Sequence, residues 1–448
     1  MKKLGLALVT IVAIATIYYV TLGSAQVVEK IKTEVNNELG LLQKSGFKVE
    51  EREASEKKDS FVLTFDDPQK ITNYLVAEGE SISVEDITLL KGMKLKMDME
   101  YLPTTTDSIS IDIYPISLPT NITKDLGIDE NSKSLQAIRE MIKEKAFMAH
   151  INFNKLLSGF DGYVKDIDKT FKDTQDSHLL LKGLTFKGNM DDKTITGFNQ
   201  KLETFAYELT DKVKVKLSKA DTSIDSSDKK TDIDYHISSI DLKINDEKKS
   251  FDVMINNITG ESKDTKRDTL LDNKSQFKIA SVNIKDAGKE SILNNIEINS
   301  VTKNLDMKAL EKLQNYSGDQ ENPDSIKEFI PILKAFTKSD MVMDISKISV
   351  ESITSEGKTF EGLNISALLK LNKDFKWDGV EANPMMLLQL PNVKANIELS
   401  NEIFSMIAQT PQAMMLMMMA QPVDKNGKKV YDIEFNQGSL KLNGKPLM

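Results

Sequence analysis

The densest group of side chains with ligand chemistry is a run of methionines near the C-terminus, in the stretch AMMLMMMAQP. Thioether sulfur is a ligand for Cu(I), but no His or Cys accompanies the run. A helix of this composition would be apolar on every side, so it must be buried or face an apolar partner. We therefore predict a short buried helix over about 411–420, packed on the apolar face of a sheet, and no metal or cofactor site.

The same run is also the centre of a candidate partner surface. Methionine is unbranched and polarizable, so it fills irregular cores and also lines adaptable apolar surfaces. Core packing is the first interpretation, and an apolar groove or partner surface is the alternative. The residues assigned to that surface are Met385, Met386, Met406, Met414, Met415, Met418 and Met419.

Residues typical of catalysis are few and scattered. The chain has 3 His, at His150, His178 and His236, and 0 Cys. It contains no nucleophile elbow, P-loop, dinucleotide fingerprint or zinc-protease motif. The acidic stretches at 173–176 and 221–225 lack the central glycine and terminal glutamate of a calcium loop. We predict a protein that is not an enzyme and has no cofactor; the alternative is an envelope hydrolase whose site is assembled from distant residues.

The N-terminus carries the strongest signal of location. Lys2 and Lys3 precede an uncharged run over 4–22, which as a helix reaches about 28 Å, close to the hydrocarbon thickness of a bilayer. The lysines should stay cytoplasmic, which places the rest of the chain outside. Residues 1–24 are thus a membrane anchor or a signal sequence cleaved after the small residues 23–25. The length of the run favours the uncleaved anchor.

The elements that follow change from helical to strand periodicity. Residues 25–44 place apolar side chains at steps of three and four, which predicts an amphipathic stalk helix. From Phe61 onward the period is two, in runs that leave one face polar, as is typical of antiparallel sheet. The sequence predicts an α+β fold dominated by β-structure, with one or more extended antiparallel sheets, several covering helices and an N-terminal membrane helix.

Helices are predicted at four places in the β-rich part. They are 134–145, 306–316 opened by Asp306, 324–337 with Pro331 inside, and 401–409 capped by Ser400. Asn426-Gly427 predicts the turn of a C-terminal hairpin. Two polar stretches, 219–232 and 259–275, are predicted as loops or hairpin tips. They make 219–275 the best place for a sub-boundary inside a domain spanning 45–448.

Composition restricts the class of partner. The net charge is -9 and the pI is about 5.2, so a basic surface for nucleic acid is not expected. Without Cys, the chain can form no disulfide, thiolate zinc site or lipoprotein anchor. Nothing in the sequence determines an oligomeric state.

Both ends of the chain resemble the YdgA-like family of Gram-negative envelope proteins, a domain of unknown function. The resemblance rests on the apolar segment that ends in YYVTLG, the helix VVEKIKTEVNNEL and the final YDIEFNQGSLKLNGKPL. The sequence departs from the family where LGSAQVVEKIK stands in place of a more compact Thr-Gly-Lys-Lys continuation. The resemblance implies a protein attached to the inner membrane that faces the periplasm, and it supplies no catalytic residues.

These observations lead to three hypotheses for function. The first is a membrane-tethered periplasmic module that binds an apolar or amphipathic partner, either lipid or an envelope protein. The second is the envelope hydrolase, which requires His178 or His236 beside Ser and Asp in a polar cleft. The third is a structural adaptor without a ligand, which requires a solid core.

Overall fold

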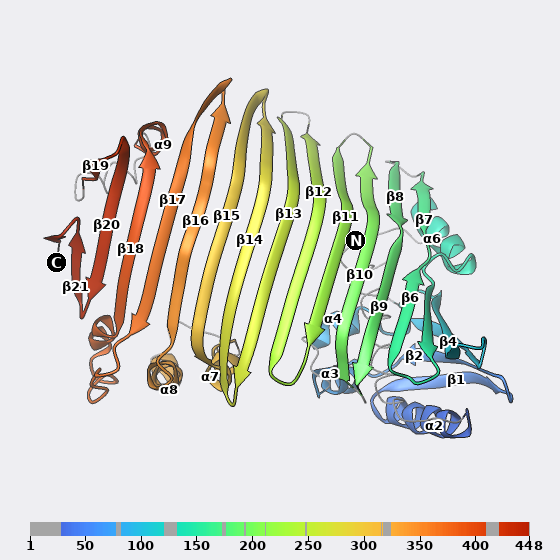
Figure 1. The fold of residues 1–448 in the computed structure, drawn as a ribbon. Helices are drawn as coiled ribbons and strands as arrows, with labels where there is room; N and C mark the ends of the chain where they lie inside the picture. Colours follow the sequence, from blue (N-terminus) through green and yellow to red (C-terminus); the bar gives the residue numbers. More distant parts are fainter. Residues whose placement is uncertain are drawn as a thin grey trace. The chain divides into compact units, whose positions relative to one another are not determined.

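The structure is a computed structural model. The predicted membrane segment at 4–22 and the predicted methionine helix at 411–420 lie outside the residues it describes. The described residues are 28–77, 82–120, 132–172, 176–191, 194–210, 212–246, 249–314, 316, 324–408 and 421–447. Within them the fold is dominated by antiparallel strands with a few helices, as the sequence predicts (Figure 1).

The chain divides into two compact units, Met1–Ile224 and Asp225–Met448, which we call unit 1 and unit 2. The division falls between Ile224 and Asp225, inside a strand, β11 (Val213–Ser226). Each unit is described separately below.

Unit 1 contains an antiparallel sheet in which strands adjacent in sequence pair with each other. β1 to β6 pair in order, and β6 and β7 then pair with β9 and β8, which in turn pair with β10. The strands are β1 (Phe47–Ala54), β2 (Lys58–Phe65), β3 (Lys94–Tyr101), β4 (Asp107–Ser117), β5 (Ala149–Asn154), β6 (Gly159–Val164), β7 (Ile167–Phe171), β8 (Ser177–Lys182), β9 (Leu184–Asp191) and β10 (Thr194–Leu209).

Helices cover one face of this sheet and complete a large core. They are α2 (Val28–Lys44), α3 (Pro68–Ala77), α4 (Val84–Thr88) and α6 (Lys133–Lys143). The apolar stripe predicted for α2 packs against the sheet, because Val35, Leu39 and Leu42 are at most 4% exposed. They join the core of the sheet, where Phe61, Leu63 and Met97 are fully buried. The apolar side chains of α2 from Val35 to Leu42 are therefore a packed part of unit 1.

Unit 2 contains a second antiparallel sheet with long strands. From β12 to β18 each strand pairs with the next, and β18 pairs with β20. The strands are β12 (Lys230–Asp246), β13 (Lys249–Arg267), β14 (Leu270–Asp286), β15 (Lys289–Asp306), β16 (Val342–Ser355), β17 (Lys358–Leu371), β18 (Pro391–Ser400), β19 (Val423–Lys425), β20 (Lys428–Asn436), β21 (Ser439–Leu442) and β22 (Lys445–Pro446).

The prediction of loops or hairpin tips at 219–232 and 259–275 is confirmed for the tips, because each stretch contains a short hairpin turn, and it is wrong for extended loops. Most of these residues belong to β11 to β14, and the turns are confined to 227–229 and 268–269. Polar side chains hydrogen-bond across the strands here: the Asn273 amide donates to the Ser262 hydroxyl over 2.8 Å and to the Asp264 carboxylate over 2.6 Å. Cross-strand pairs of this kind support a sheet without apolar side chains.

The helices of unit 2 pack at the ends of its strands. They are α7 (Met307–Gln314), α8 (Asp324–Lys338), the 3-10 helix η1 (Pro384–Gln389) and α9 (Asn401–Ile407). The predicted caps are confirmed, because Asp306 accepts from the Ala309 N–H and Ser400 from the Ile403 N–H. In the hairpin between β19 and β20, Asn426 and Gly427 have φ of 53° and 76°, as the predicted Asn-Gly turn requires.

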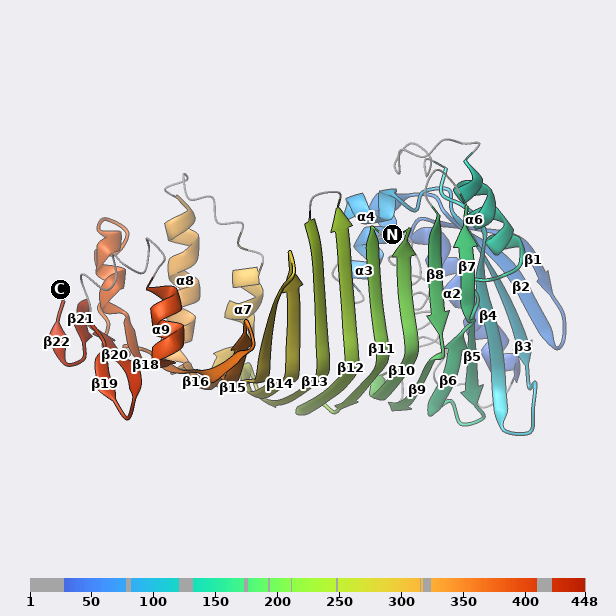
Figure 2. The same cartoon turned by 90° about the horizontal axis from the view of Figure 1, so that it is seen from above.

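Two small apolar clusters lie under α8, one around Phe336 and Met341 and one around Ile330 and Leu390. Figure 2 shows α7, α8 and α9 on one side of the unit 2 sheet. Among the described residues, no helix combines the length and the apolarity needed to cross a bilayer.

Candidate functional site

Two apolar rows run across the unit 2 sheet, perpendicular to its strands. In each row, residues on neighbouring strands face each other directly in the register from β12 to β18. The rows are two residues apart along every strand, so they lie on the same face. We call them the apolar band: Ile237, Ile258, Ile279, Ile296, Val350, Leu363 and Leu399 form one row, and Tyr235, Gly260, Phe277, Ile298, Ile348, Ile365 and Ile397 form the other.

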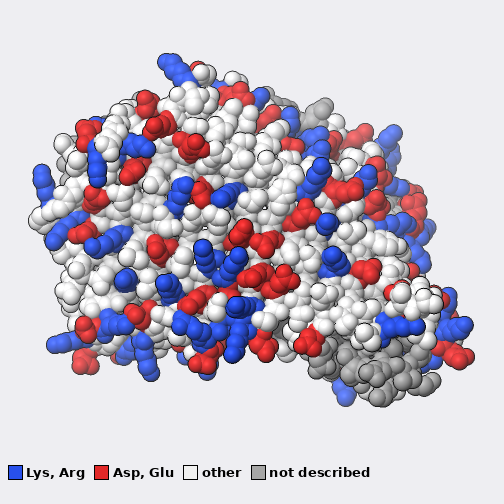
Figure 3. Space-filling model, viewed as in Figure 1, with Lys and Arg blue, Asp and Glu red and all other residues white. Residues whose placement is uncertain are grey.

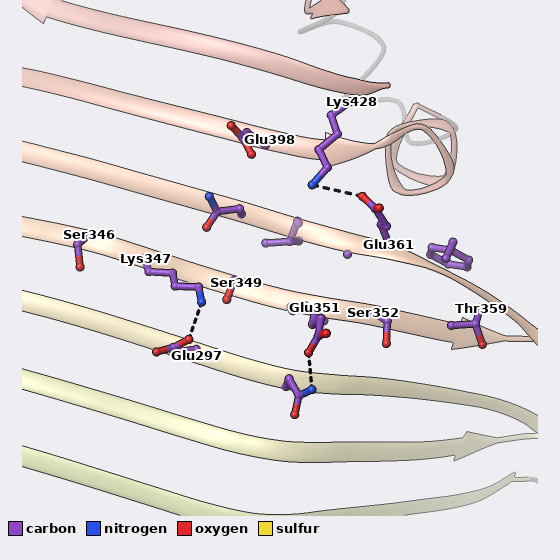
Figure 4. A pocket seen from close by; sticks show the side chains of 16 residues that line it. Glu297, Ser346, Lys347, Ser349, Glu351, Ser352, Thr359, Glu361, Glu398 and Lys428 are labelled. Carbon is purple, nitrogen blue, oxygen red and sulfur yellow. Dashed lines mark hydrogen bonds and ion pairs between the residues drawn. The ribbon is translucent and has the colours of Figure 1, made fainter. Parts of the chain in front are cut away.

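The row between these two carries polar side chains on the opposite face. It includes Lys278, Glu297 and Glu398, and Lys347 bonds Glu297 over 2.6 Å. The hydrogen bond from Lys347, joined by one from Asn299, holds the pKa of Glu297 below its usual value. Figure 4 shows this ion pair in a pocket on the polar face, together with the pair between Lys428 and Glu361.

The pocket in Figure 4 is a charged surface without catalytic geometry. Lysines pair with two of its carboxylates, Glu297 with Lys347 and Glu361 with Lys428, and the Asn295 amide donates a hydrogen bond to Glu351. On the face turned to the viewer in Figure 3, acidic and basic side chains are likewise intermingled and form no single-sign patch. A mixed surface of this kind keeps a protein soluble and selects no charged ligand.

The apolar band is only half-buried. In β12 to β15, Ile258 is the one hydrophobic side chain below 9% exposure among the described residues, and Ile298 is 36% exposed. The clusters under α8 include Leu371, which alternates with Ile365 along β17 and so lies on the same face. The helices therefore lie on the same face of the sheet as the apolar band, but they pack at the strand ends. No residue of the band belongs to either cluster.

Neutral polar side chains flank the band on one side. Two residues beyond it, Ser275 and Ser300 hydrogen-bond each other over 2.7 Å. On the other side, the Asn294 amide donates to the Ser352 hydroxyl over 3.2 Å, but Ser352 faces Glu361 in the register and lines the pocket of Figure 4 on the polar face. Because Ser275 and Ser300 satisfy each other, their side of the band offers an occupant contact area without charge.

Of the methionines assigned to a partner surface, the three that the structure describes lie at two separate places. Met385 and Met406 are 68% and 53% exposed, and the half-buried Met386 packs in the cluster that contains Trp377. Met385 and Met386 lie on η1 before β18, whereas Met406 lies on α9 after it. The ten residues of β18 separate the two sites by about 33 Å. The other assigned residues, Met414, Met415, Met418 and Met419, lie outside the described residues.

The three histidines lie on separate strands, His150 on β5, His178 on β8 and His236 on β12. His150 bonds Asp112 over 2.7 Å, and His178 bonds Asp168 over the same distance near the solvent. His236 lies on β12, in the polar row opposite the apolar band. The described residues thus show His–Asp pairs on sheet surfaces and no polar cleft that assembles a triad.

The closest approach to a catalytic arrangement is a polar row across unit 1. Ser60, Asp98, Asp112 and His150 face each other in register on β2 to β5. The Ser60 hydroxyl donates to Asp98 over 2.7 Å, and the Tyr114 hydroxyl donates to the same carboxylate over 2.6 Å. These hydrogen bonds outweigh the burial of Asp98 and lower its pKa.

Because Ser60 is bonded to the carboxylate of Asp98, it is not paired with an imidazole base as nucleophilic catalysis requires. Among the described residues, no group of three or more His, Cys, Asp or Glu is arranged to hold a metal ion. The unit 1 row therefore supplies neither a nucleophile–base pair nor a metal centre.

Sequence periodicity showed the alternation on individual strands but missed the apolar band. Ile237, Ile258, Ile279 and Ile296 are each about 20 residues from the next, and only the register of three hairpins aligns them. This spacing is the one signal in the sequence that could have revealed the row. No protein-family model, no curated protein and no solved structure matches the chain.

Proposed function

We propose that this protein is a non-enzymatic periplasmic module, tethered to the inner membrane by residues 4–22, that binds lipid hydrocarbon along the apolar band of unit 2. The observation that carries the proposal is the band itself, an apolar surface across seven consecutive strands that the described helices leave half-exposed. At about 4.8 Å between strands, it extends about 29 Å. The resemblance to YdgA-like envelope proteins is consistent with this location.

The chemistry of the band favours hydrocarbon over a specific protein partner. Protein interfaces combine an apolar centre with a rim that makes directional hydrogen bonds to the partner. Here the flanking Ser275 and Ser300 side chains bond each other, and the charged groups of the intervening row lie on the opposite face. An envelope protein with an amphipathic segment is the second occupant that such a surface admits.

The arrangement of polar groups supports a binding role over hydrolysis. The alternative hydrolase needs a serine whose hydroxyl donates to an imidazole, with a third group orienting that imidazole. His150 and His178 have their carboxylate partners, Asp112 and Asp168, but the bonds at these pairs include no serine. The adaptor hypothesis, which needs a solid core, is disfavoured by the half-exposed band in unit 2.

The test is to extract and identify lipid from the purified full chain by mass spectrometry. The variant Ile279→Asp places a carboxylate in the middle of the band and should abolish co-purifying lipid, because a charge cannot be transferred into hydrocarbon without a large cost. Lys278→Asp is the control for position, since it introduces the same residue at the next position, on the exposed opposite face, where it also removes the ion pair with Glu297.

Circular dichroism decides whether both variants keep the sheet. We expect lipid on the parent chain and on Lys278→Asp, and none on a folded Ile279→Asp. The proposal is contradicted if lipid stays bound to the folded Ile279→Asp variant. It is also contradicted if the parent chain, purified from membranes, carries no bound lipid. Retention of a protein in place of lipid identifies the amphipathic envelope partner instead.

A further inference from the structure

The first helix of unit 1 begins at one particular end of its sheet. The ammonium of Lys32, near the start of α2, lies 5.6 Å from the centre of the Tyr101 ring. Tyr101 is the last residue of β3, so the beginning of α2 lies beside the turn that follows β3. The end of α2 connects through 45–46 to β1 at the opposite end of the sheet.

Three turns are adjacent at the end where α2 begins. They are residues 55–57, 102–106 and 155–158, which join β1 to β2, β3 to β4 and β5 to β6. The Tyr101 N–H donates to the Lys57 carbonyl over 2.8 Å, and the Lys155 N–H donates to the Thr106 carbonyl over 2.9 Å. These backbone bonds hold the three turns side by side.

The turns expose leucines that the core of unit 1 does not use. Leu156 is 82% exposed, more than any other large hydrophobic residue in the described part of the chain, and Leu102 is 52% exposed. The neighbouring Leu157, in contrast, is 4% exposed and belongs to the core. An exposed leucine at the tip of a turn adds nothing to folding, whereas at a bilayer surface its side chain can enter the headgroup region.

The charges on the same turns suit an anionic lipid surface. Lys57 and Lys155 are exposed, and Glu56 is the one acidic residue within the three turns. Lysines near a membrane surface are attracted to anionic headgroups. Apolar side chains flanked by lysine are the combination that surface-bound segments use.

The length of the chain between the predicted anchor and α2 independently indicates which end of unit 1 lies near the membrane. From Leu22 to Val28, where α2 begins, an extended chain reaches about 20 Å at most. If residues 4–22 span the bilayer, the start of α2 cannot be farther than that from the membrane surface. The end of unit 1 with the start of α2 therefore faces the membrane, and it is also the end that carries Leu102 and Leu156.

We propose that the turns 55–57, 102–106 and 155–158 of unit 1 rest on the outer surface of the membrane, with Leu102 and Leu156 inserted among the lipid headgroups. The inference rests on the tether of the proposed function and is independent of lipid binding by unit 2. The contact would fix the orientation of unit 1 on the bilayer, because it adds attachment points to the single tether.

The absence of Cys from the chain allows a site-specific test. The full chain carrying Leu156→Cys is labelled with a polarity-sensitive fluorophore and reconstituted into vesicles of phosphatidylethanolamine and phosphatidylglycerol. The control is Lys91→Cys, because Lys91 is exposed and precedes β3, at the opposite end of the same sheet. We expect a blue shift and a loss of iodide quenching for the label at 156, and unchanged aqueous emission at 91.

Flotation of the vesicles separates failure of the contact from failure of the tether. If the chain floats with the vesicles and the label at 156 is as accessible as the label at 91, the contact is excluded and the tether stands. If the chain does not float, the tether and the contact that rests on it are both wrong. A blue shift that persists without vesicles and grows with protein concentration would instead identify a second copy of the chain as the occupant.

Discussion

Unit 1 and unit 2 are built on the same kind of sheet, yet they use its apolar face differently. In unit 1, α2, α3, α4 and α6 contribute to one large core, in which Phe61 and Leu63 are fully buried. In unit 2, the helices pack at the strand ends and the apolar band in the middle is half-exposed. The comparison teaches that a period-two pattern specifies an apolar face, but not whether that face is used for folding or for a ligand.

The physical difference lies in how stability is obtained. Burial of apolar surface stabilises unit 1 in the usual way, at about 25 cal/mol per Å². Unit 2 relies more on the cross-strand ladder of its long strands, of up to 19 residues, and on side-chain pairs such as Asn273–Asp264. Its apolar face remains free to gain the same burial energy from another molecule.

The largest expected effect comes from truncating one phenylalanine in each unit. Phe61→Ala in unit 1 should destabilise the chain by about 3–5 kcal/mol, because it leaves a cavity in a close-packed core. Phe277→Ala in the apolar band should cost about 1 kcal/mol, because its side chain is half-exposed and leaves no enclosed cavity. Urea unfolding of the full chain measures both. Equal losses would show that the band is covered and that the contrast between the units is wrong.

An intermediate effect is expected from adding a ligand to the parent chain. Hydrocarbon that binds only the folded band adds about 2.7 kcal/mol of stability at 100 times its Kd. Hydrogen–deuterium exchange with a saturating lysophospholipid should therefore protect β13 to β15 and leave β2 to β4 unchanged. Protection of both units alike would point to a general detergent effect. Unchanged exchange in both units would contradict ligand binding by unit 2.

The smallest expected effect compares one half-buried carboxylate in each unit. Hydrogen bonds from Lys48, Lys94 and Thr64 lower the pKa of Glu50 from 4.5 to about 2. Because the folded-state pKa lies below the ordinary value, the stabilisation is present above about pH 4.5 and is lost as the pH falls toward 2. Glu50→Gln should remove this part of the acid dependence, and added salt should weaken the effect in the parent chain.

Glu297→Gln is the counterpart in unit 2, where Lys347 lowers the pKa of Glu297 in the same direction. Acid titration of the urea midpoint should show both variants losing less stability on acidification than the parent chain. If the two variants follow the parent chain at every pH and salt concentration, these ion pairs do not contribute to stability in either unit.

Several elements were determined by the sequence itself, because short-range interactions are sufficient for them. The alternation in β2, β3 and β17, and the apolar stripe of α6, follow from side-chain periodicity alone. The caps at Asp306 and Ser400 satisfy N–H groups three residues away. The resulting β-dominated fold class was predictable for the same reason.

Only the tertiary structure decided how these elements combine. The polar stretches 219–232 and 259–275 become strands because neighbouring strands satisfy their hydrogen bonds, which no local pattern reports. Ile258, Ile279 and Ile296 form one row through the register of two hairpins, and Leu102 and Leu156 meet at one end of unit 1 through the pairing of its strands. Side-chain periodicity acts within a strand, whereas the two surfaces proposed to meet lipid are created by pairing between strands that are distant in sequence.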